Sequence, residues 1–247
     1  MAIAKLEKQY LVRSYEGDQN NNLRLVTCMN ILQDAATTDA DRRGFGMEFC
    51  QKHNMTWVGN DYVIEIVRLP KIGENIKVVT WPSLSGKLAA RRDFAIYDEK
   101  GELIIKSASR WLLISLDKKR PLPISEILQG YEPVEEYILE TNFDKIAEVD
   151  EQAEMYQYRV RYDDIDINHH INNAVYVLWA GEAVDEEWHK THIPLRIEVN
   201  FKKEGFIGEE IVVATITEGQ KTMHSIRAKG DNARELARVA IIWKKYE

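Results

Sequence analysis

Apolar positions in the first half of the chain follow a helical period and then a strand-like one. Within residues 23–43 they recur every three or four positions, which places them on one helix face. They are Leu25, Met29, Leu32 and Ala36. The next stretches are rich in valine, isoleucine, tryptophan and tyrosine, as strands are. They lie near 55–69, 74–82, 87–97 and 102–116. With an extended segment at 5–16, this half predicts one helix followed by a meander.

The second half repeats this order. A strand at about 154–162 precedes a helix at about 172–190. Further strands follow near 195–203, 209–218, 221–230 and 234–245. The helix is apolar all round at 174–180, so it must be covered on every side. A curled antiparallel sheet wrapped around the helix supplies that cover.

The two halves also share residues at a nearly constant shift. Ile64-Glu65 recurs as Ile197-Glu198, and the triplet Ile-Gly-Glu at 72–74 recurs at 207–209. Such a repeat indicates an internal duplication. We therefore predict an α+β double hotdog, in which each long helix is wrapped by its own sheet and one chain supplies its own dimer. Its units are expected at 1–120 and 151–247, joined by a proline-containing connector at 121–150.

Composition narrows the function classes. The chain has 40 acidic and 33 basic residues and a net charge of -7, so it should repel nucleic acid. Short cationic runs are predicted to be solvated edges; they are Arg42-Arg43, Arg91-Arg92, Lys118-Lys119-Arg120 and Lys202-Lys203. Two cysteines favour a reducing compartment. The N-terminus lacks the pattern of a signal or transit peptide, and no stretch is apolar enough to span a bilayer. We expect a cytoplasmic protein.

The densest candidate chemistry lies just before the second helix. Asp164, Asp166, Asn168 and His170 occupy alternate positions. In an extended segment they would share one face and could meet one small ligand. The alternative is structural, because aspartate and asparagine also gather in turns and at helix N-termini, where they bond local backbone N–H groups.

The same segment resembles a family signature. Asp166-Ile-Asn-His-His-Ile-Asn-Asn is similar to the Asp-x-Asn-x-His-x-Asn-Asn motif of the acyl-acyl-carrier-protein (acyl-ACP) thioesterases of plant plastids and bacteria. Three further elements resemble that family in the same order along nearly the whole chain. They are Val12-Arg13-Ser14-Tyr15-Glu16, Met29-Asn30-Ile31-Leu32-Gln33-Asp34-Ala35-Ala36, and Trp81-Pro82-Ser83-Leu84-Ser85-Gly86-Lys87 followed by Arg91-Arg92-Asp93.

The resemblance implies the active-site residues. They are Asp166, Asn168, His170 and Glu204. The last is the counterpart of the family's catalytic glutamate in a Tyr-Arg-Arg-Glu-Cys element. The chain departs from the plant pattern at Gly205, where plant members often carry cysteine, so no thiol nucleophile can act there. It departs again at His169, where glutamine is common, and we expect His169 at the surface or behind the site.

The implied reaction is hydrolysis of fatty acyl-ACP to free fatty acid and carrier protein, as in fatty acid biosynthesis, with no cofactor or metal. Glu204 or Asp166, helped by His170, would activate a water molecule while Asn168 holds the water or polarises the carbonyl. In a covalent alternative, Asp166 attacks to form an acyl anhydride. Backbone N–H groups at the start of the second helix are candidates for the oxyanion pocket.

The resemblance also implies how the substrate is held. It places the acyl chain in the first unit, where Met29, Leu32 and Trp57 are candidates to line the slot. The expected partner is acyl carrier protein, and Lys202-Lys203 are candidate docking cations. Pairing of whole chains into a homodimer stays open at this point.

Three other functions fit parts of the sequence. The first is an acyl-coenzyme A thioesterase, which would use similar chemistry and a different docking surface. The second is a non-catalytic acyl-binding hotdog protein, which would have no need for this set of polar residues. The third is a metal hydrolase that uses His169, His170, Asp166 and Glu204 as ligands. Adjacent histidines in an extended segment point apart, and no metal-ligand spacing supports that reading.

Overall fold

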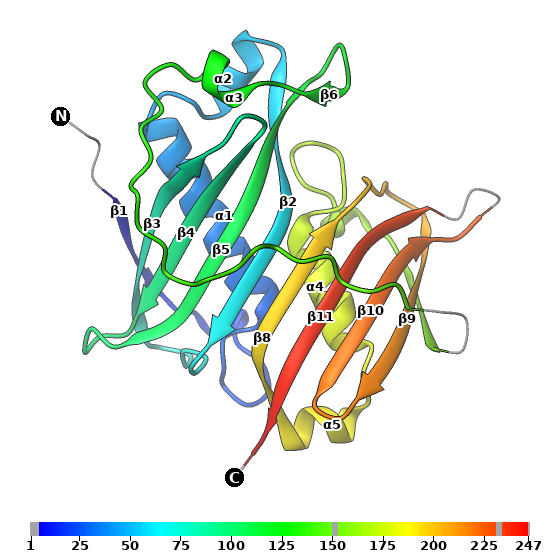
Figure 1. Cartoon of the computed structure of the whole chain (residues 1–247). Coiled ribbons are helices and arrows are strands. Elements are labelled where there is room, and N and C mark those ends of the chain that lie inside the picture. The colour runs from blue at the N-terminus through cyan, green and yellow to red at the C-terminus, as the bar shows by residue number, and fades with distance from the viewer. Residues whose placement is uncertain (1–4, 150–152, 231–233, 247) are drawn as a thin grey trace. The chain divides into compact units, whose positions relative to one another are not determined.

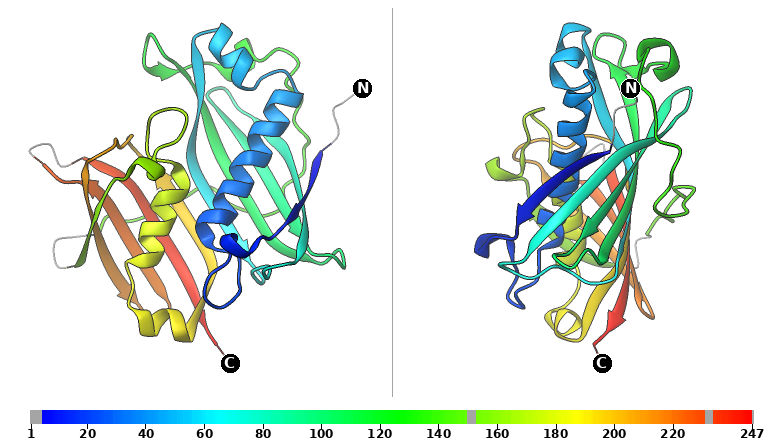
Figure 2. Two further views of the ribbon diagram at one scale, coloured as in Figure 1. Left: turned by 180° about the vertical axis from the view of Figure 1, so that it is seen from behind. Right: turned by 90° about the vertical axis from the view of Figure 1, so that its left-hand side faces the viewer.

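The computed structural model describes residues 5–149, 153–230 and 234–246. The chain divides into two compact units, Met1–Phe143 and Asp144–Glu247. In each unit a helix lies against one face of an antiparallel sheet, as Figure 2 shows from behind. This is the α+β hotdog plan, present twice. In the described part of the chain, no helix is long and apolar enough to cross a membrane.

The first unit follows the predicted order of one long helix and a meander (Figure 1). Its elements are β1 (Leu6–Leu11), η1 (Ser14–Glu16), α1 (Leu25–Arg42), α2 (Met47–Lys52), β2 (Met55–Ile66), β3 (Asn75–Ser85), β4 (Ala89–Tyr97), β5 (Leu103–Ser115), β6 (Arg120–Pro121) and α3 (Ile124–Ile127). The strand order is β1-β3-β4-β5-β2, with β6 beside β5. Met29, Leu32 and Ala36 of the predicted apolar stripe are buried, as its period requires.

Charged residues occupy the interior of this unit on the helix side of the sheet. Asp39 of α1 is fully buried and accepts hydrogen bonds from Arg43 and Arg92, each at 2.8 Å. Burial alone would raise the pKa of Asp39, but these two guanidinium groups outweigh it and hold the pKa below its usual value. The helix is therefore tied to β4 by an ion pair as well as by apolar packing.

The opposite side of the same sheet holds the segment that leads to the second unit. The buried carboxylate of Asp93 accepts hydrogen bonds from Arg91 and from the Ile138 N–H at 2.9 Å. Arg91 also donates to the Leu139 carbonyl at 2.6 Å. The other residues of the four predicted cationic runs are exposed. Because Arg91, Arg92 and Arg43 are buried, however, the prediction that they lie at solvated edges was wrong. Their carboxylate partners make that burial tolerable.

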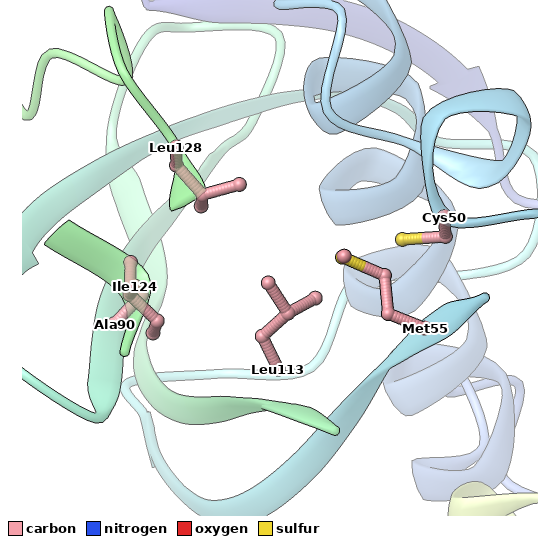
Figure 3. Packing of buried hydrophobic residues seen from close by; sticks show 6 residues of the cluster. All are labelled: Cys50, Met55, Ala90, Leu113, Ile124 and Leu128. Carbon is pink, nitrogen blue, oxygen red and sulfur yellow. The ribbon is translucent and has the colours of Figure 1, made fainter. Parts of the chain in front are cut away.

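An apolar cluster closes one end of the first unit. Side chains from α2, β2, β4, β5 and the α3 region converge in it, as the close-up in Figure 3 shows. They are Cys50, Met55, Ala90, Leu113, Ile124 and Leu128. Trp57, on β2, packs against this cluster and donates its indole N–H to the Phe45 carbonyl at 2.9 Å.

The second unit has the same plan with a shorter helix. Its elements are β7 (Glu154–Arg159), η2 (Tyr162–Asp164), α4 (Asn173–Glu182), α5 (Glu186–Thr191), β8 (His192–Phe201), β9 (Glu210–Glu218), β10 (Lys221–Ala228) and β11 (Glu235–Lys245). The strand order is β8-β11-β10-β9-β7. The single helix predicted at 172–190 is two helices. The backbone of Asp185 is extended, and its carboxylate accepts a hydrogen bond from the Trp188 N–H at 2.6 Å. Asp185 therefore caps the start of a second helix.

One histidine of this sheet is fully buried. The two ring nitrogens of His224 each lie 2.9 Å from a threonine hydroxyl, Thr215 on one side and Thr222 on the other. Burial lowers the pKa of His224 to about 3. The imidazole is therefore neutral in the folded state across the ordinary pH range, whereas in the unfolded chain it titrates near its usual value of about 6.5.

We expect this histidine to make folding sensitive to acid. Between about pH 3 and 6.5 the imidazole is protonated in the unfolded chain and neutral in the folded chain. The free energy of unfolding is therefore unaffected by this group above about pH 6.5, and it decreases by about 1.4 kcal/mol for each unit that the pH falls within the window. Urea unfolding across this window should show a shallower pH dependence for His224→Gln than for the wild type. His53→Gln, which alters an exposed histidine, should follow the wild type. Equal slopes for all three proteins would contradict the assignment.

Candidate active site

The segment with the densest polar chemistry forms a closed loop between β7 and α4. After the short helix η2, Ile165 and Ile171 pair as an isolated antiparallel bridge. Within that bridge, the Asp166 N–H donates to the His170 carbonyl at 2.9 Å. The prediction that alternate residues of an extended segment share one face was therefore wrong, because the chain turns back on itself.

Asp164 has a structural role. Its buried carboxylate accepts from the Arg161 backbone N–H at 2.7 Å and from the Arg161 guanidinium at 2.8 Å. It closes η2, and its carboxylate is engaged by Arg161. The structural alternative thus holds for this acid.

Asp166 and Asn168 lie together at the tip of the loop. The Asn168 N–H donates to Asp166 Oδ1 at 2.8 Å, and its carboxamide nitrogen lies 3.4 Å from Oδ2. The turn requires a positive φ of 63° at His169, whose side chain is exposed. Asp166 is thus oriented by a local turn, with its carboxylate partly accessible.

His170 faces Glu204, which lies beyond the end of β8. Its Nε2 is 3.3 Å from Glu204 Oε2. The two side chains are 31% and 59% exposed, so the pair is open to a ligand. The His170 ring also forms a T-shaped contact with Phe206, with ring centroids 5.3 Å apart. The structure therefore brings His170 and Glu204 together from distant segments of the chain. The other two predicted residues, Asp166 and Asn168, meet within a single loop.

A backbone hydrogen bond joins the two loops that carry these residues. The Ile171 N–H donates to the Gly205 carbonyl at 2.9 Å. A Cβ at Gly205 would lie 2.4 Å from Ile171 Cδ1 and 3.0 Å from Leu236 Cδ1, so these side chains would have to move to accommodate it. Gly205, which departs from the plant pattern, therefore allows Ile171 and Leu236 to pack closely against this loop.

The start of α4 is capped from within. The Asn172 side-chain oxygen accepts from the Ala174 N–H at 3.0 Å, and the Asn172 carbonyl accepts from the Val175 N–H at 2.9 Å. Two donors proposed for an oxyanion pocket are thus already engaged. The expected docking cation Lys202 is engaged as well, by Glu235 at 2.7 Å.

The first unit contains a matching loop. In it the Asn20 N–H donates to Asp18 Oδ1 at 2.8 Å, and the Asp18 N–H donates to the Asn22 carbonyl at 2.7 Å. Asn21 has a φ of 61°, as His169 has 63°. Asn22 occupies the place of His170, and its side chain binds Lys71 at 2.7 Å. The turn is therefore a property of the fold, and the histidine facing a carboxylate distinguishes the second unit.

Sequence reasoning missed two residues beside the His170 and Glu204 pair. Phe206 contacts His170, and Arg234 contacts the Glu204 carbonyl. Nothing in local spacing marks Arg234, which lies 30 positions beyond Glu204. Among the described residues, no group of three or more histidine, cysteine, aspartate or glutamate side chains is arranged to hold a metal ion.

Two family models match the chain. The acyl-ACP thioesterase N-terminal domain matches residues 4–131, and the acyl-ACP thioesterase C-terminal domain matches residues 147–245. Among plant relatives, oleoyl-acyl carrier protein thioesterase 1 of Arabidopsis thaliana is 26% identical over 97% of the chain and 76% of its own length. The palmitoyl-acyl carrier protein thioesterase of Gossypium hirsutum is 26% identical over 94% of the chain and 60% of its own length. Both are chloroplastic proteins.

Solved structures share the fold over the whole chain. An acyl-ACP thioesterase from Bacteroides thetaiotaomicron superposes with a TM-score of 0.88, at 24% identity, over 97% of this chain and 98% of that one. A 12:0-ACP thioesterase from Umbellularia californica superposes with a TM-score of 0.86, at 21% identity, over 98% of each chain. The predicted double hotdog fold is confirmed.

We expect a side chain at Gly205 to push the two loops apart. Gly205→Ala should destabilise the protein by about 1–3 kcal/mol through overpacking against Ile171, and should lower turnover of acyl-ACP. Ile171→Val removes the Cδ1 atom, so the double variant should be less destabilised than the sum of the two single changes. Chemical unfolding and kcat measure both effects.

Gly181→Ala is the matched control, because a Cβ at that glycine of α4 meets no atom within 4 Å. It should leave kcat close to that of the wild type and should not lower stability, because alanine is the better helix former. Additive losses in the Gly205 and Ile171 pair would show that their contact does not limit the site.

Proposed function

Because the chain belongs to the acyl-ACP thioesterase family and is a thioester hydrolase, we propose that Asp166, Asn168, His170 and Glu204 form the site that hydrolyses fatty acyl-ACP. The observation that carries this proposal is the approach of His170 Nε2 to Glu204 Oε2 at 3.3 Å. A carboxylate beside an imidazole can orient that ring and accept a proton from water. The matching loop of the first unit has asparagine in place of the histidine.

In the proposed reaction, Glu204 and His170 hold a water molecule against the thioester carbonyl. The water oxygen attacks the carbonyl carbon while its proton passes to the pair. The carbon–sulfur bond then breaks, and the thiolate of the carrier takes up a proton. Because an alkyl thiol has a pKa near 8.5, it leaves readily, so positioning and stabilisation of the oxyanion are the main tasks.

Asp166 and Asn168 act on the carbonyl side in this scheme. The Asp166 carboxylate accepts a backbone hydrogen bond from Asn168 at 2.8 Å and lies beside its carboxamide, so the aspartate fixes the direction of the amide. Asn168 is then available to polarise the carbonyl. This engagement of Asp166 supports attack by water over attack by Asp166 itself, which would form an anhydride.

The acyl chain is proposed to lie in the first unit. Met29 and Leu32 are fully buried on α1, and Trp57 packs against the apolar cluster of Figure 3. These side chains offer the apolar surroundings that a fatty acyl chain needs.

The proposed partner is acyl carrier protein, whose acyl group is the substrate. A homodimer of whole chains stays a prediction. A cytoplasmic location is also proposed, supported by the two free cysteines Cys28 and Cys50.

Glu204→Gln and His170→Ala should each lower kcat with acyl-ACP by about 10²-fold or more, since each removes a proton-transfer group. Asp166→Asn should lower it as well. Asp18→Asn, in the matching loop of the first unit, is the control and should leave kcat near the wild-type value. Parallel assays with the same acyl group on coenzyme A test the acyl-coenzyme A alternative. Full activity of the Glu204 and His170 variants would remove the proposed site.

Two leucines test the proposed acyl region. Leu32→Ala opens space on the helix side of the first unit, so it should raise the relative kcat/KM for longer acyl chains across a panel of acyl-ACP substrates. Leu139→Ala removes the same side-chain volume on the connector side, where Leu139 packs with Val63 and Ala108, and should leave the profile unchanged. Each change should cost about 2–5 kcal/mol of stability. Identical profiles for both variants would exclude Leu32 from the acyl site.

A further inference from the structure

The position of the Glu204 carboxylate depends on the backbone of its loop. The side chain is 59% exposed, so solvent surrounds most of it and packing does not fix its direction. The loop between β8 and β9 must therefore present Glu204 to His170. Its beginning is held by β11, because the Lys202 N–H donates to the Leu236 carbonyl at 2.8 Å.

Arg234 reaches this loop from the approach to β11. Its Nη2 lies 3.3 Å from the Glu204 carbonyl oxygen and 2.6 Å from Glu209 Oε1. Its Nε lies 3.4 Å from the same carbonyl. The planar guanidinium thus spans the two ends of the 204–209 turn, which a single point charge cannot do as well.

The ring of Phe206 lies between Arg234 and His170. The Arg234 guanidinium lies over the Phe206 ring, 5.5 Å from its centroid. The Phe206 ring in turn meets His170 edge to face, with centroids 5.3 Å apart. Arg234 therefore contacts Glu204 directly at its peptide carbonyl, whereas the Phe206 ring separates it from His170.

The acid that pairs with Arg234 completes the turn. Glu209 Oε2 accepts from the Phe206 N–H at 2.9 Å, while Oε1 accepts from Arg234. Arg234 and Glu209 neutralise one another, so their effect on the site is mainly positional. We propose that Arg234, with Glu209, is a positioning residue that holds Glu204 against His170.

This inference rests on the proposed site, and the first unit supplies a matched comparison. There Glu74 accepts from the Lys71 N–H at 2.9 Å and pairs with Arg68 at 2.6 Å. An arginine thus pairs with the glutamate of this turn in both units, although Arg68 precedes its turn after β2 and Arg234 lies just before β11. In the first unit Lys71 of the turn binds Asn22, which stands where the second unit has His170.

The test is a double-mutant cycle between Arg234 and Glu204, measured by steady-state kinetics with acyl-ACP. Arg234→Met should lower kcat by about 10-fold to 100-fold with KM changed less than about threefold, the loss typical of a residue that orients a reacting group. In a Glu204→Gln background the same change should lower kcat less than about twofold, because the carboxylate that it positions is gone. Arg234→Lys should recover part of the loss.

Two further variants separate positioning from folding. Arg68→Met removes the equivalent clamp of the first unit and should leave kcat near the wild-type value, even where it lowers the unfolding temperature. Glu209→Gln, which deprives the turn of one acceptor, should lower kcat in the same direction as Arg234→Met and serves as the test if that variant fails to fold.

The outcomes distinguish this inference from the proposed site. An equal fold loss for Arg234→Met in both backgrounds, or no loss in the wild-type background, would overturn the positioning role. A normal kcat for Glu204→Gln would overturn the proposed site itself, whatever the behaviour of Arg234.

Discussion

One backbone hydrogen bond, from the Ile171 N–H to the Gly205 carbonyl, joins the two loops on which the candidate site depends. One loop leads into α4 and carries Asp166, Asn168 and His170, and the other follows β8 and carries Glu204. The pair of His170 and Glu204 takes one member from each loop. A side chain at position 205 would meet the side chains of Ile171 and Leu236, so glycine suits this position. The geometry of the site thus depends on a contact between two loops that are distant in sequence.

The two units separate what the fold needs from what the chemistry needs. Both contain a turn in which an aspartate accepts from the N–H two residues later, followed by a residue of positive φ. Both contain a glutamate that closes the facing turn and pairs with an arginine. These shared features stabilise loops at the entry to a helix. The second unit alone adds His170 facing Glu204, whereas the first has Asn22 bound to Lys71. The two units thus share a scaffold, and their polar side chains differ.

Buried charge is the second constraint on this molecule. Arg91, Arg92 and Asp93 lie on one strand, and alternation sends Arg92 to Asp39 on the helix side and the other two to the connector on the opposite side. A short run of charges therefore ties the sheet to both of its neighbours. Composition could not show this, because a charged run is usually solvated. The cost of burying these groups is offset by fully engaged partners.

The sequence by itself determined the order of the long helix and the main strands in each half, the repetition of that order and the family likeness. Periodicity, turn residues and motifs are local properties, so α1 and the turn around Asp166 could be expected from them. The likeness also placed Glu204 in the site, but it could not show the distance to His170. Only the tertiary structure showed that His170 lies next to Glu204 and that Asp164 is bound by Arg161 and is therefore outside the site. It also revealed the capped start of α4 and the contact of Arg234 with the 204–209 turn. Those contacts join residues far apart in the chain, and they depend on strand register and loop closure, which no local pattern encodes.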